Sequence, residues 1–434
     1  TWMWQVEMPI VRILIEVETR GVALDKAHLK KLKAEAFKIL EDLEKKIYQK
    51  VGYKFDIASP KQLAKVLFDD QKIGMRKDGT NEFTARGKNG DWSTANDVLE
   101  AIKREEIKKS SSKKDREPSL IELLLDFRET NTQLNVFIKP LFDRCVNAPY
   151  IINPRFIQVG TVSGRFASKD PNYQNLPRKG GIRGAFIARQ GYKIVRADYS
   201  QAELRLMAHM SGDPVMIDIY NKNGDIHQTT ADACGISRQA AKACNFGLIY
   251  RMSALRLQAQ LALEGILISI EQAQNYVNKY FQKYVKVRQY HKKVENTVME
   301  RLRENGEYGY VKTLGGRYRH LDKSYLTMKE TAFSSITQAI NTTIQGGVSD
   351  LIKVAMIDCT NIFREKGWLD PEKNIWRAYI EGQVHDELFI ECEEALAEEV
   401  SKIVTYCMEN AGRKFKIKVP MTAEAKIVSS LAKV

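Results

Sequence analysis

Apolar residues recur at helical spacing through most of the first 145 residues. Residues 5–20 follow this pattern and precede Gly21, which predicts a short helix that ends there. Asp25 introduces a longer amphipathic helix, and Ser59-Pro60 indicates the start of another. Residues 76–93 and the charged run 103–116 lack the periodicity, so we expect loops, the second a solvated connection between helices.

After Pro149 the pattern becomes strand-like. Residues 150–166 alternate and lead into a polar stretch broken by glycine. Tyr192–Ala197 predicts a strand, followed by Asp198 and a helix that begins near Gln201. Residues 213–300 again favour helix, and Trp376–Glu391 is typical of a β-hairpin. The expected fold class is α+β, with helix-rich regions around a small antiparallel sheet.

Chain length and composition exclude several classes of protein. A chain of 434 residues is too long for one compact core, and no apolar run is long enough to span a membrane. The N-terminus lacks signal-peptide features, and a first residue other than Met suggests a trimmed fragment. Six scattered cysteines form no C-x-x-C pair, which favours a reducing compartment.

The net charge of the chain indicates the kind of partner that it binds. Lys and Arg number 68 against 54 Asp and Glu, a net charge of +14. This surplus favours a polyanion, most often nucleic acid, although a protein can be basic without such a partner.

Two carboxylates could form a metal site. Asp198 ends a predicted strand, and Asp386 lies between His385 and Glu387 in the predicted hairpin. Carboxylates together with substrate phosphates suit Mg²⁺, and two such ions can activate a hydroxyl and stabilise a leaving pyrophosphate. The alternative is a pair of surface turn residues.

A third pattern lies on one predicted helix over residues 237–250. Arg238, Lys242, Phe246 and Tyr250 recur every four residues and share one face. Two cations followed by two aromatic rings suit a nucleotide, with the cations on phosphates and the rings on sugar and base. The alternative is that the rings belong to the core and the cations are solvated.

Two further patterns are weaker. The segment from Arg155 to Asn175 mixes arginine, amides and glycine, which suits phosphate and minor-groove contacts. Residues 15–21 are similar to a proofreading-exonuclease motif, but Glu16 replaces its first Asp and the segment favours helix. We therefore expect a structural role there.

Taken together, the motifs resemble those of family A DNA polymerases, the bacterial DNA polymerase I and phage group. They occur in the family's order: T-V-S-G-R-F…P-N-Y-Q-N-L-P at 161–177, D-Y-S-Q-A-E-L-R at 198–205, R-Q-A-A-K-A-C-N-F-G-L-I-Y at 238–250 and V-H-D-E-L at 384–388. Weaker matches lie at 18–25, 59–68, 225–227, 313–317 and 341–346. The resemblance covers nearly all of the chain.

The resemblance implies a right-hand polymerase fold, with helical thumb and fingers around an antiparallel palm sheet. The implied domains are palm at 1–22, thumb at 23–145, palm at 146–212, fingers at 213–335 and palm at 336–434, without an intact proofreading exonuclease. The implied activity is template-directed addition of deoxynucleotides from dNTPs to a primer 3′-OH with two Mg²⁺ ions, which Mn²⁺ can replace.

The resemblance also assigns roles to single residues. The implied metal ligands are Asp198, Asp386 and the Tyr199 carbonyl, and Glu387 supports the metal site. Lys242 is the implied proton donor to the leaving pyrophosphate. Nucleotide binding falls to Arg238, Lys242, Phe246, Tyr250, His227, Glu203 and Gln201, with Glu203 excluding a 2′-hydroxyl. DNA binding falls to Arg165, Gln345, His385, Asn341, Arg317, Thr161, Asn172, Gln174 and Asn175.

Departures from the family pattern bear on specificity. Arg251 stands where the family usually has Gly, Gln239 replaces a commonly basic residue, and Ala202 replaces a larger apolar one. Two other functions stay open: a reverse transcriptase of the same fold, and a non-catalytic nucleic-acid clamp, which would not need paired carboxylates. We expect a cytoplasmic monomer, or an organellar one, that binds primer–template and dNTPs and no membrane.

Overall fold

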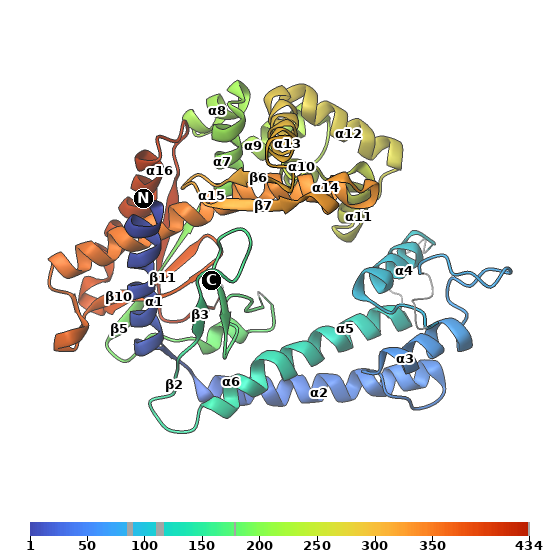
Figure 1. Ribbon diagram of the computed structural model, residues 1–434. Helices are drawn as coiled ribbons and strands as arrows, with labels where there is room; N and C mark the ends of the chain where they lie inside the picture. Colours follow the sequence, from blue (N-terminus) through green and yellow to red (C-terminus); the bar gives the residue numbers. More distant parts are fainter. Residues whose placement is uncertain (85–89, 110–116, 178, 433–434) are drawn as a thin grey trace. The chain divides into compact units, whose positions relative to one another are not determined.

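The chain divides into two compact units (Figure 1). The computed structural model describes residues 1–84, 90–109, 117–177 and 179–432. One unit comprises residues 1–24, 147–176 and 183–434, and the other comprises 25–146 with 177–182. Parts of the two predicted loops, residues 85–89 and 110–116, lie outside the described residues.

The smaller unit is built from helices whose starts are set by side-chain caps. Helix α2 (Lys26–Val51) begins at Asp25, whose carboxylate accepts a hydrogen bond from the His28 amide at 2.9 Å. Helix α3 (Pro60–Ala64) begins at Ser59 in the same way. Helix α2 packs against α5 (Leu120–Thr132), η3 (Gln133–Ile138) and α6 (Lys139–Arg144). The predicted caps at Asp25 and Ser59 are confirmed.

The charged run is helical where the structure describes it. Helix α4 covers Asn96–Lys109, so the predicted loop is wrong for residues 103–109. Lys, Arg and Glu are good helix formers, and the helix is anchored by buried Ile102 just before the run. The helix therefore continues through a charged segment that has no apolar periodicity of its own. Helix η2 (Lys65–Asp70) follows α3 in this unit.

A four-stranded antiparallel sheet forms the centre of the larger unit. Its order is β10 (Ala378–Val384), β11 (Glu387–Glu393), β5 (Tyr192–Tyr199) and β12 (Ala423–Val428). The predicted hairpin is confirmed, although it begins at Ala378 because Ile375–Trp376 (β9) pairs with Leu369–Asp370 (β8) instead. Helices α1 (Met8–Arg20), α15 (Lys329–Glu365) and α16 (Ala397–Lys414) pack against this sheet.

Alternation along the strands separates the two faces of the sheet. Leu388 and Ile390 belong to the main apolar core, whereas Phe389 packs against Tyr173 with ring centroids 6.3 Å apart. Asp198 is two residues beyond Arg196, which is paired in register with Phe389. The backbone therefore places Asp198 on the face away from the main core.

The N-terminal segment is helical, as predicted. A π-helical turn, η1 (Met3–Glu7), continues into α1, which includes residues 15–20 of the exonuclease-like motif. The helix ends at Gly21, where φ is +66° and an added Cβ would lie 2.5 Å from the Ile152 carbonyl oxygen. Only glycine fits this turn, which precedes β1 (Val22–Ala23), the partner of β2 (Ile151–Ile152).

Residues 150–170 form less strand than their alternation predicts. Besides β2, the structure has only the short pair β3 (Arg155–Ile157) and β4 (Ala167–Lys169) there. The intervening residues make a turn held by side-chain hydrogen bonds, which compete with ladder formation.

Residues 213–300 are largely helical, as predicted. The elements between residues 202 and 328 are α7 (Ala202–Ser211), α8 (Pro214–Asn221), α9 (Ile226–Cys234), α10 (Arg238–Leu248), α11 (Ala254–Leu263), α12 (Ile270–Lys283), α13 (Val285–Asn305), β6 (Tyr308–Lys312), β7 (Tyr318–Asp322) and α14 (Lys323–Thr327). Helix α10 ends before Tyr250, so the predicted extension of this helix to residue 250 is wrong. A turn follows, and Ser253 caps α11.

No helix of the described part is long and apolar enough to cross a membrane. All six cysteines are buried and unbridged.

Candidate active site

The two candidate metal carboxylates lie on neighbouring strands. Asp198 is the penultimate residue of β5, and Asp386 sits in the turn that joins β10 to β11. The Tyr199 amide donates a hydrogen bond to the Asp386 carbonyl at 3.3 Å, which ties the turn to the end of β5. His385 adopts a left-handed φ of +57° and its side chain is exposed at this turn. The sheet therefore brings Asp198, Tyr199, His385 and Asp386 together.

Glu387 is held by two arginines that the sequence analysis did not identify. Its buried carboxylate accepts from Arg196 Nε at 2.9 Å and lies 3.4 Å from Arg183 Nη1. Arg196 precedes Asp198 by two residues on β5, and Glu387 pairs in register with Asp198. The alternation of charged residues at 196 and 198 was the available signal, because residues two apart on a strand share a face.

Asp386 lies in an environment of like charge. Burial raises the pKa of its carboxyl, and the nearby carboxylates of Glu203 and Glu387 raise it further, opposed by Arg165. Glu203, in the first turn of α7, pairs with Arg165 at 2.8 Å. A polar cluster of Asp386, Glu203 and Arg165 thus joins three segments that are distant in sequence.

Tyr250 belongs to the same cluster. Burial raises the pKa of its phenol, the Glu203 carboxylate raises it further, and the Gln345 side chain lowers it. The Tyr250 hydroxyl makes no hydrogen bond of ordinary geometry with a described residue. Asn341, one turn before Gln345 on α15, also has a buried side-chain oxygen without such a bond in the described chain. Buried polar groups of this kind are suited to a bound ligand.

The basic face of α10 is confirmed for its first three members. Arg238, Lys242 and Phe246 lie within the helix at intervals of four residues. Arg238 pairs with Asp225 at 2.8 Å, and the exposed Lys242 makes no ion pair with any residue that the structure describes. Phe246 is half-buried against His227, with ring centroids 5.8 Å apart. The helix thus presents two cations and a ring beside a histidine of α9.

His227 is buried and neutral. Burial lowers the pKa of its imidazole, and the positive charges of Arg238 and Lys242 lower it further against the opposing effect of Asp225. The Asn245 amide donates to His227 Nδ1 at 2.9 Å, which leaves the proton on Nε2. Burial acts to raise the pKa of Asp225, but hydrogen bonds from Arg238 and two backbone amides lower it overall. The site therefore has a neutral donor beside two cations.

Several of the predicted DNA-binding residues make internal bonds. Thr161 donates to the Arg165 carbonyl at 2.7 Å, and Gln174 donates to the Gln383 carbonyl at 2.5 Å. Asn172 accepts from the Asn175 amide at 3.2 Å. These residues shape the loop that carries Arg165. Asn175 is itself exposed.

Arg317 and Gln201 are also engaged within the protein. Arg317 pairs at 2.5 Å with Glu7, whose carboxylate also meets the fully buried Lys353 at 3.0 Å. Burial acts to raise the pKa of Glu7, but Lys353, Gln158 and Arg317 lower it to about 2. The Gln201 side chain accepts from the Tyr220 hydroxyl at 3.0 Å. The sequence analysis did not identify Glu7 or Lys353, because their partners are far away in the chain.

The residues present fit a hard divalent cation. Asp198 and Asp386 supply carboxylate oxygens, and a cation would relieve the like-charge environment that raises the pKa of Asp386. Among the described residues, no group of three or more His, Cys, Asp or Glu side chains is arranged to hold a metal. Mg²⁺ at such a site would rely on water and substrate phosphates for its other ligands.

Comparisons with known proteins agree with this arrangement. The chain is 34% identical to thermostable DNA polymerase I of Thermus filiformis and 32% identical to DNA polymerase I of Pseudomonas aeruginosa. Each alignment covers 98% of this chain, but 47% and 43% of the relative, so the chain spans about half the length of these relatives.

A solved structure has the same fold. The polymerase domain of Pol1 from M. smegmatis, in a complex with DNA primer–template and dNTP, superposes with a TM-score of 0.82 at 30% identity. The match covers 99% of this chain and 70% of that chain, and it confirms the right-hand polymerase fold. The family model for DNA polymerase family A matches residues 26–433. With the motifs, the fold and this match in agreement, the chain belongs to DNA polymerase family A.

Proposed function

We propose that the chain catalyses template-directed DNA synthesis, adding deoxynucleotides from dNTPs to a primer 3′-OH. The observation that carries the proposal is the hydrogen bond between the Tyr199 amide and the Asp386 carbonyl, which holds the two carboxylate-bearing segments together. Pure binding of nucleic acid does not need paired carboxylates, so this pairing disfavours the clamp alternative. The complex of the M. smegmatis domain with primer–template and dNTP supports the same substrates here.

Asp198 and Asp386, with the Tyr199 carbonyl, would hold two Mg²⁺ ions. Bound there, the ions would activate the primer hydroxyl and stabilise the charge on the leaving pyrophosphate. The Arg196 and Arg183 contacts of Glu387 support a positioning role, since they fix the strand that follows Asp386.

The triphosphate would lie along the exposed face of α10. Arg238 and Lys242 would bind phosphate oxygens, and neutral His227 would donate from Nε2 to a further oxygen. Lys242 is well suited to protonate the pyrophosphate because it is exposed and makes no ion pair with a described residue. Phe246 would contact the sugar, Glu203 would lie near its 2′ carbon, and Tyr250 would pack near the template position.

Primer–template contacts would come from the other polar residues near the turn of β10 and β11. Arg165, Gln345 and His385 would read the minor groove at the primer terminus, with Asn341, Arg317 and the loop of Thr161, Asn172, Gln174 and Asn175 nearby. The net charge of +14 supports duplex binding.

Domain names follow from the same proposal. Residues 23–145 would be the thumb, and residues 25–145 lie in the smaller compact unit. Residues 213–335 would be the fingers, and the sheet with its flanking helices would be the palm.

Primer extension tests the proposal. We expect the chain to extend a DNA primer on a DNA template with Mg²⁺ and to stop with a chelator. Parallel reactions on an RNA template measure reverse transcription, the alternative within the same fold. Exclusive use of RNA templates would favour that alternative, and binding without extension would favour the clamp.

Carboxylate variants complete this test. Asp198→Asn and Asp386→Asn each remove a metal ligand worth several kcal/mol of transition-state stabilisation, so extension should fall about 1,000-fold. Binding of primer–template should change little, because it depends on phosphate contacts with Lys and Arg. Asp218→Asn is the matched control, since Asp218 is an exposed carboxylate paired with Lys222. Substantial extension by either site variant would contradict the metal assignment.

A further inference from the structure

Arg251 occupies a backbone conformation that favours glycine. It follows Tyr250 in the turn between α10 and α11, and its φ is +58°. The turn is closed by hydrogen bonds from the Arg251 amide to the Leu248 carbonyl at 3.2 Å and from the Met252 amide to the Gly247 carbonyl at 3.1 Å. A residue with a Cβ is disfavoured here, and contacts of the arginine side chain can offset this cost.

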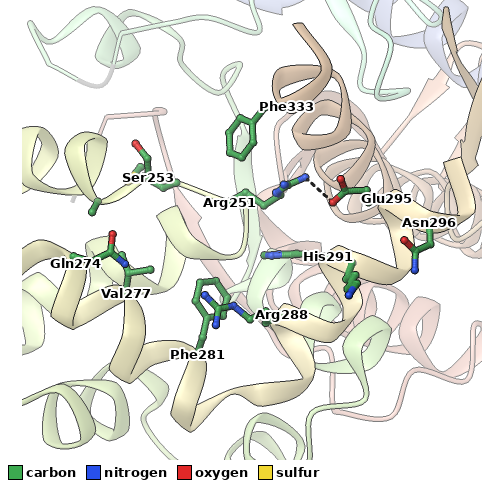
Figure 2. Close-up of a pocket in the computed structure, with 13 residues that line it drawn as sticks. Arg251, Ser253, Gln274, Val277, Phe281, Arg288, His291, Glu295, Asn296 and Phe333 are labelled. Atoms are coloured by element: carbon green, nitrogen blue, oxygen red, sulfur yellow. Dashed lines mark ion pairs between the residues drawn. The ribbon is translucent and has the colours of Figure 1, made fainter. Parts of the chain in front are cut away.

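Those contacts join the turn to two other helices. The Arg251 guanidinium lies 4.5 Å from the ring centroid of Phe333 on α15, and Nη1 lies 3.6 Å from the Glu295 carboxylate on α13. Figure 2 shows the Arg251 side chain between these two partners. The Arg251 side chain is 19% exposed, which is low for a charged group near the surface. The arginine thus links the turn to two helices through one side chain.

A second restraint acts two residues earlier. His291 on α13 donates from Nε2 to the Ile249 carbonyl at 2.9 Å. Burial lowers the pKa of His291 to about 4, with smaller effects of Arg251 and Arg288, so the ring is neutral and keeps this bond at neutral pH. Residues 249 and 251 are therefore both held by α13.

Tyr250 lies between these two restrained residues. Its phenol is buried beside Glu203 and Gln345 in the candidate active site. Because its neighbours on both sides are anchored, movement of the Tyr250 backbone requires that the turn be released. A glycine at position 251 would fit the same φ but would supply neither the guanidinium–ring contact nor the ion pair.

We infer that Arg251 is a positioning residue for nucleotide selection, which holds Tyr250 against the forming base pair by fastening the turn to Phe333 and Glu295. This inference rests on the proposed function. A fixed Tyr250 ring leaves less room for a mispaired nucleotide than for a correct one, so the fastening acts on discrimination more than on correct incorporation.

The hollow beside Arg251 offers a matched control. It has a volume of about 620 Å³ and is lined on α13 by Arg288, His291, Lys292, Glu295 and Asn296. Arg288 lies over Phe281 at 5.0 Å and does not belong to the turn. Arg288→Ala therefore removes the same charge from the same hollow without releasing Tyr250.

The central experiment compares single-nucleotide incorporation by Arg251→Gly, Glu295→Gln, Arg288→Ala and the parent. We expect Arg251→Gly to raise kcat/KM for mismatched dNTPs relative to correct ones by roughly 5- to 10-fold, with a smaller rise for Glu295→Gln and none for Arg288→Ala. An unchanged ratio in Arg251→Gly would overturn the inference. A loss of template affinity shared by Arg251→Gly and Arg288→Ala, with the ratio unchanged, would instead mean that the hollow binds nucleic acid.

Two measurements without catalysis keep the inference testable apart from the proposed function. Hydrogen exchange of the amides at 248–253 should be faster in Arg251→Gly and Glu295→Gln than in the parent or Arg288→Ala. Arg251→Ala should melt at a lower temperature than Arg251→Gly, because alanine keeps the strained φ and loses the contacts. A parent that fails to extend would refute the proposed function alone. Unaltered exchange in Arg251→Gly would refute the fastening, whatever the activity of the parent.

Discussion

The central sheet and helix α10 hold their charged residues in opposite ways. In the sheet, the buried carboxylates of Glu387 and Glu391 are paired with arginines, Glu391 through the Arg189 amide at 2.6 Å and its guanidinium. On α10, Lys242 is exposed and makes no ion pair with a described residue, and Arg238 has an exposed partner, Asp225. The arginine-paired charges in the sheet are therefore committed to the fold, whereas those on α10 are available to a ligand. Substitutions on α10 should affect catalysis with little effect on stability, and substitutions at the arginine-paired carboxylates of the sheet should affect stability.

Among the variants that test this comparison, removal of a cation from α10 should have the largest effect. We expect Lys242→Ala to lower kcat/KM for dNTPs by roughly 10- to 100-fold, because a charge-assisted phosphate contact is lost, and the melting temperature to stay unchanged. Arg238→Ala should lower kcat/KM for dNTPs by a smaller factor, since Arg238 is already paired with Asp225. Lys222→Ala, in an exposed pair on α8, is the control. A lower melting temperature or weaker duplex binding in Lys242→Ala would break the comparison.

The buried carboxyl group of Glu381 in the sheet has no hydrogen-bond partner among the described residues, and it should make stability depend on pH. Glu381 lies at a bulge in β10, and neither side-chain oxygen has a hydrogen-bond partner among the described residues. Burial raises its pKa well above the ordinary 4.5, and the neighbouring Glu391 carboxylate raises it further, opposed by Arg189; Tyr173 also faces it. We therefore expect Glu381 to keep its proton to a higher pH in the folded protein than in the unfolded chain.

A raised pKa in the folded state fixes the direction in which stability changes with pH. The stability that Glu381 contributes is fully present below about pH 4.5 and is lost as pH rises toward the folded pKa. Between pH 5 and pH 8 the parent should lose up to about 1.4 kcal/mol per pH unit relative to Glu381→Gln. Urea unfolding across this range measures the difference. Parallel curves for parent and variant would show that the carboxyl is ionised in the fold.

A hydroxyl added to the α10 ring should change sugar selection. Phe246 offers no hydrogen bond to replace a missing 3′-hydroxyl, so Phe246→Tyr should raise incorporation of dideoxynucleotides about 5-fold relative to deoxynucleotides. Competition between the two substrates measures the ratio, and a thermal melt run beside it detects a packing role. An unchanged ratio with a lower melting temperature would place the ring in the core.

The smallest effect is expected for Glu203, which would lie near the 2′ carbon of a bound nucleotide. Glu203→Ala should admit ribonucleotides about threefold more readily, or ~0.6 kcal/mol, at some cost in normal activity because Arg165 loses its partner. Glu203→Gln keeps the size of the side chain and separates bulk from charge. Equal discrimination in Glu203→Ala and the parent would remove Glu203 from this role.

The sequence predicts those parts of the structure that depend on neighbouring residues. The caps at Asp25 and Ser59, the end of α1 at Gly21 and the spacing on α10 are all set within a few positions, and all are confirmed. The hairpin that carries Asp386 is also visible, because its two strands are adjacent in the chain.

Features that depend on distant partners were missed. The pairing of Arg317 with Glu7 joins residues 310 positions apart in the sequence, and the two arginines on Glu387 come from different segments. The end of α10 before Tyr250 is set by the turn at Arg251, whose contacts lie on α13 and α15. Local patterns identify candidate residues, but tertiary contacts decide which of them keep a free charge.

The pairing of β5 on both edges has a consequence for how the protein is made. Tyr199 pairs with Ala423 of β12, and Asp198 pairs with Glu387 of β11, so the strand that carries Asp198 depends on segments synthesised much later. Pairings between such distant segments are slow to form. A nascent chain should therefore pair Asp198 with Glu387 only after β11 has left the ribosome, and the other edge of β5 should stay open until β12 follows.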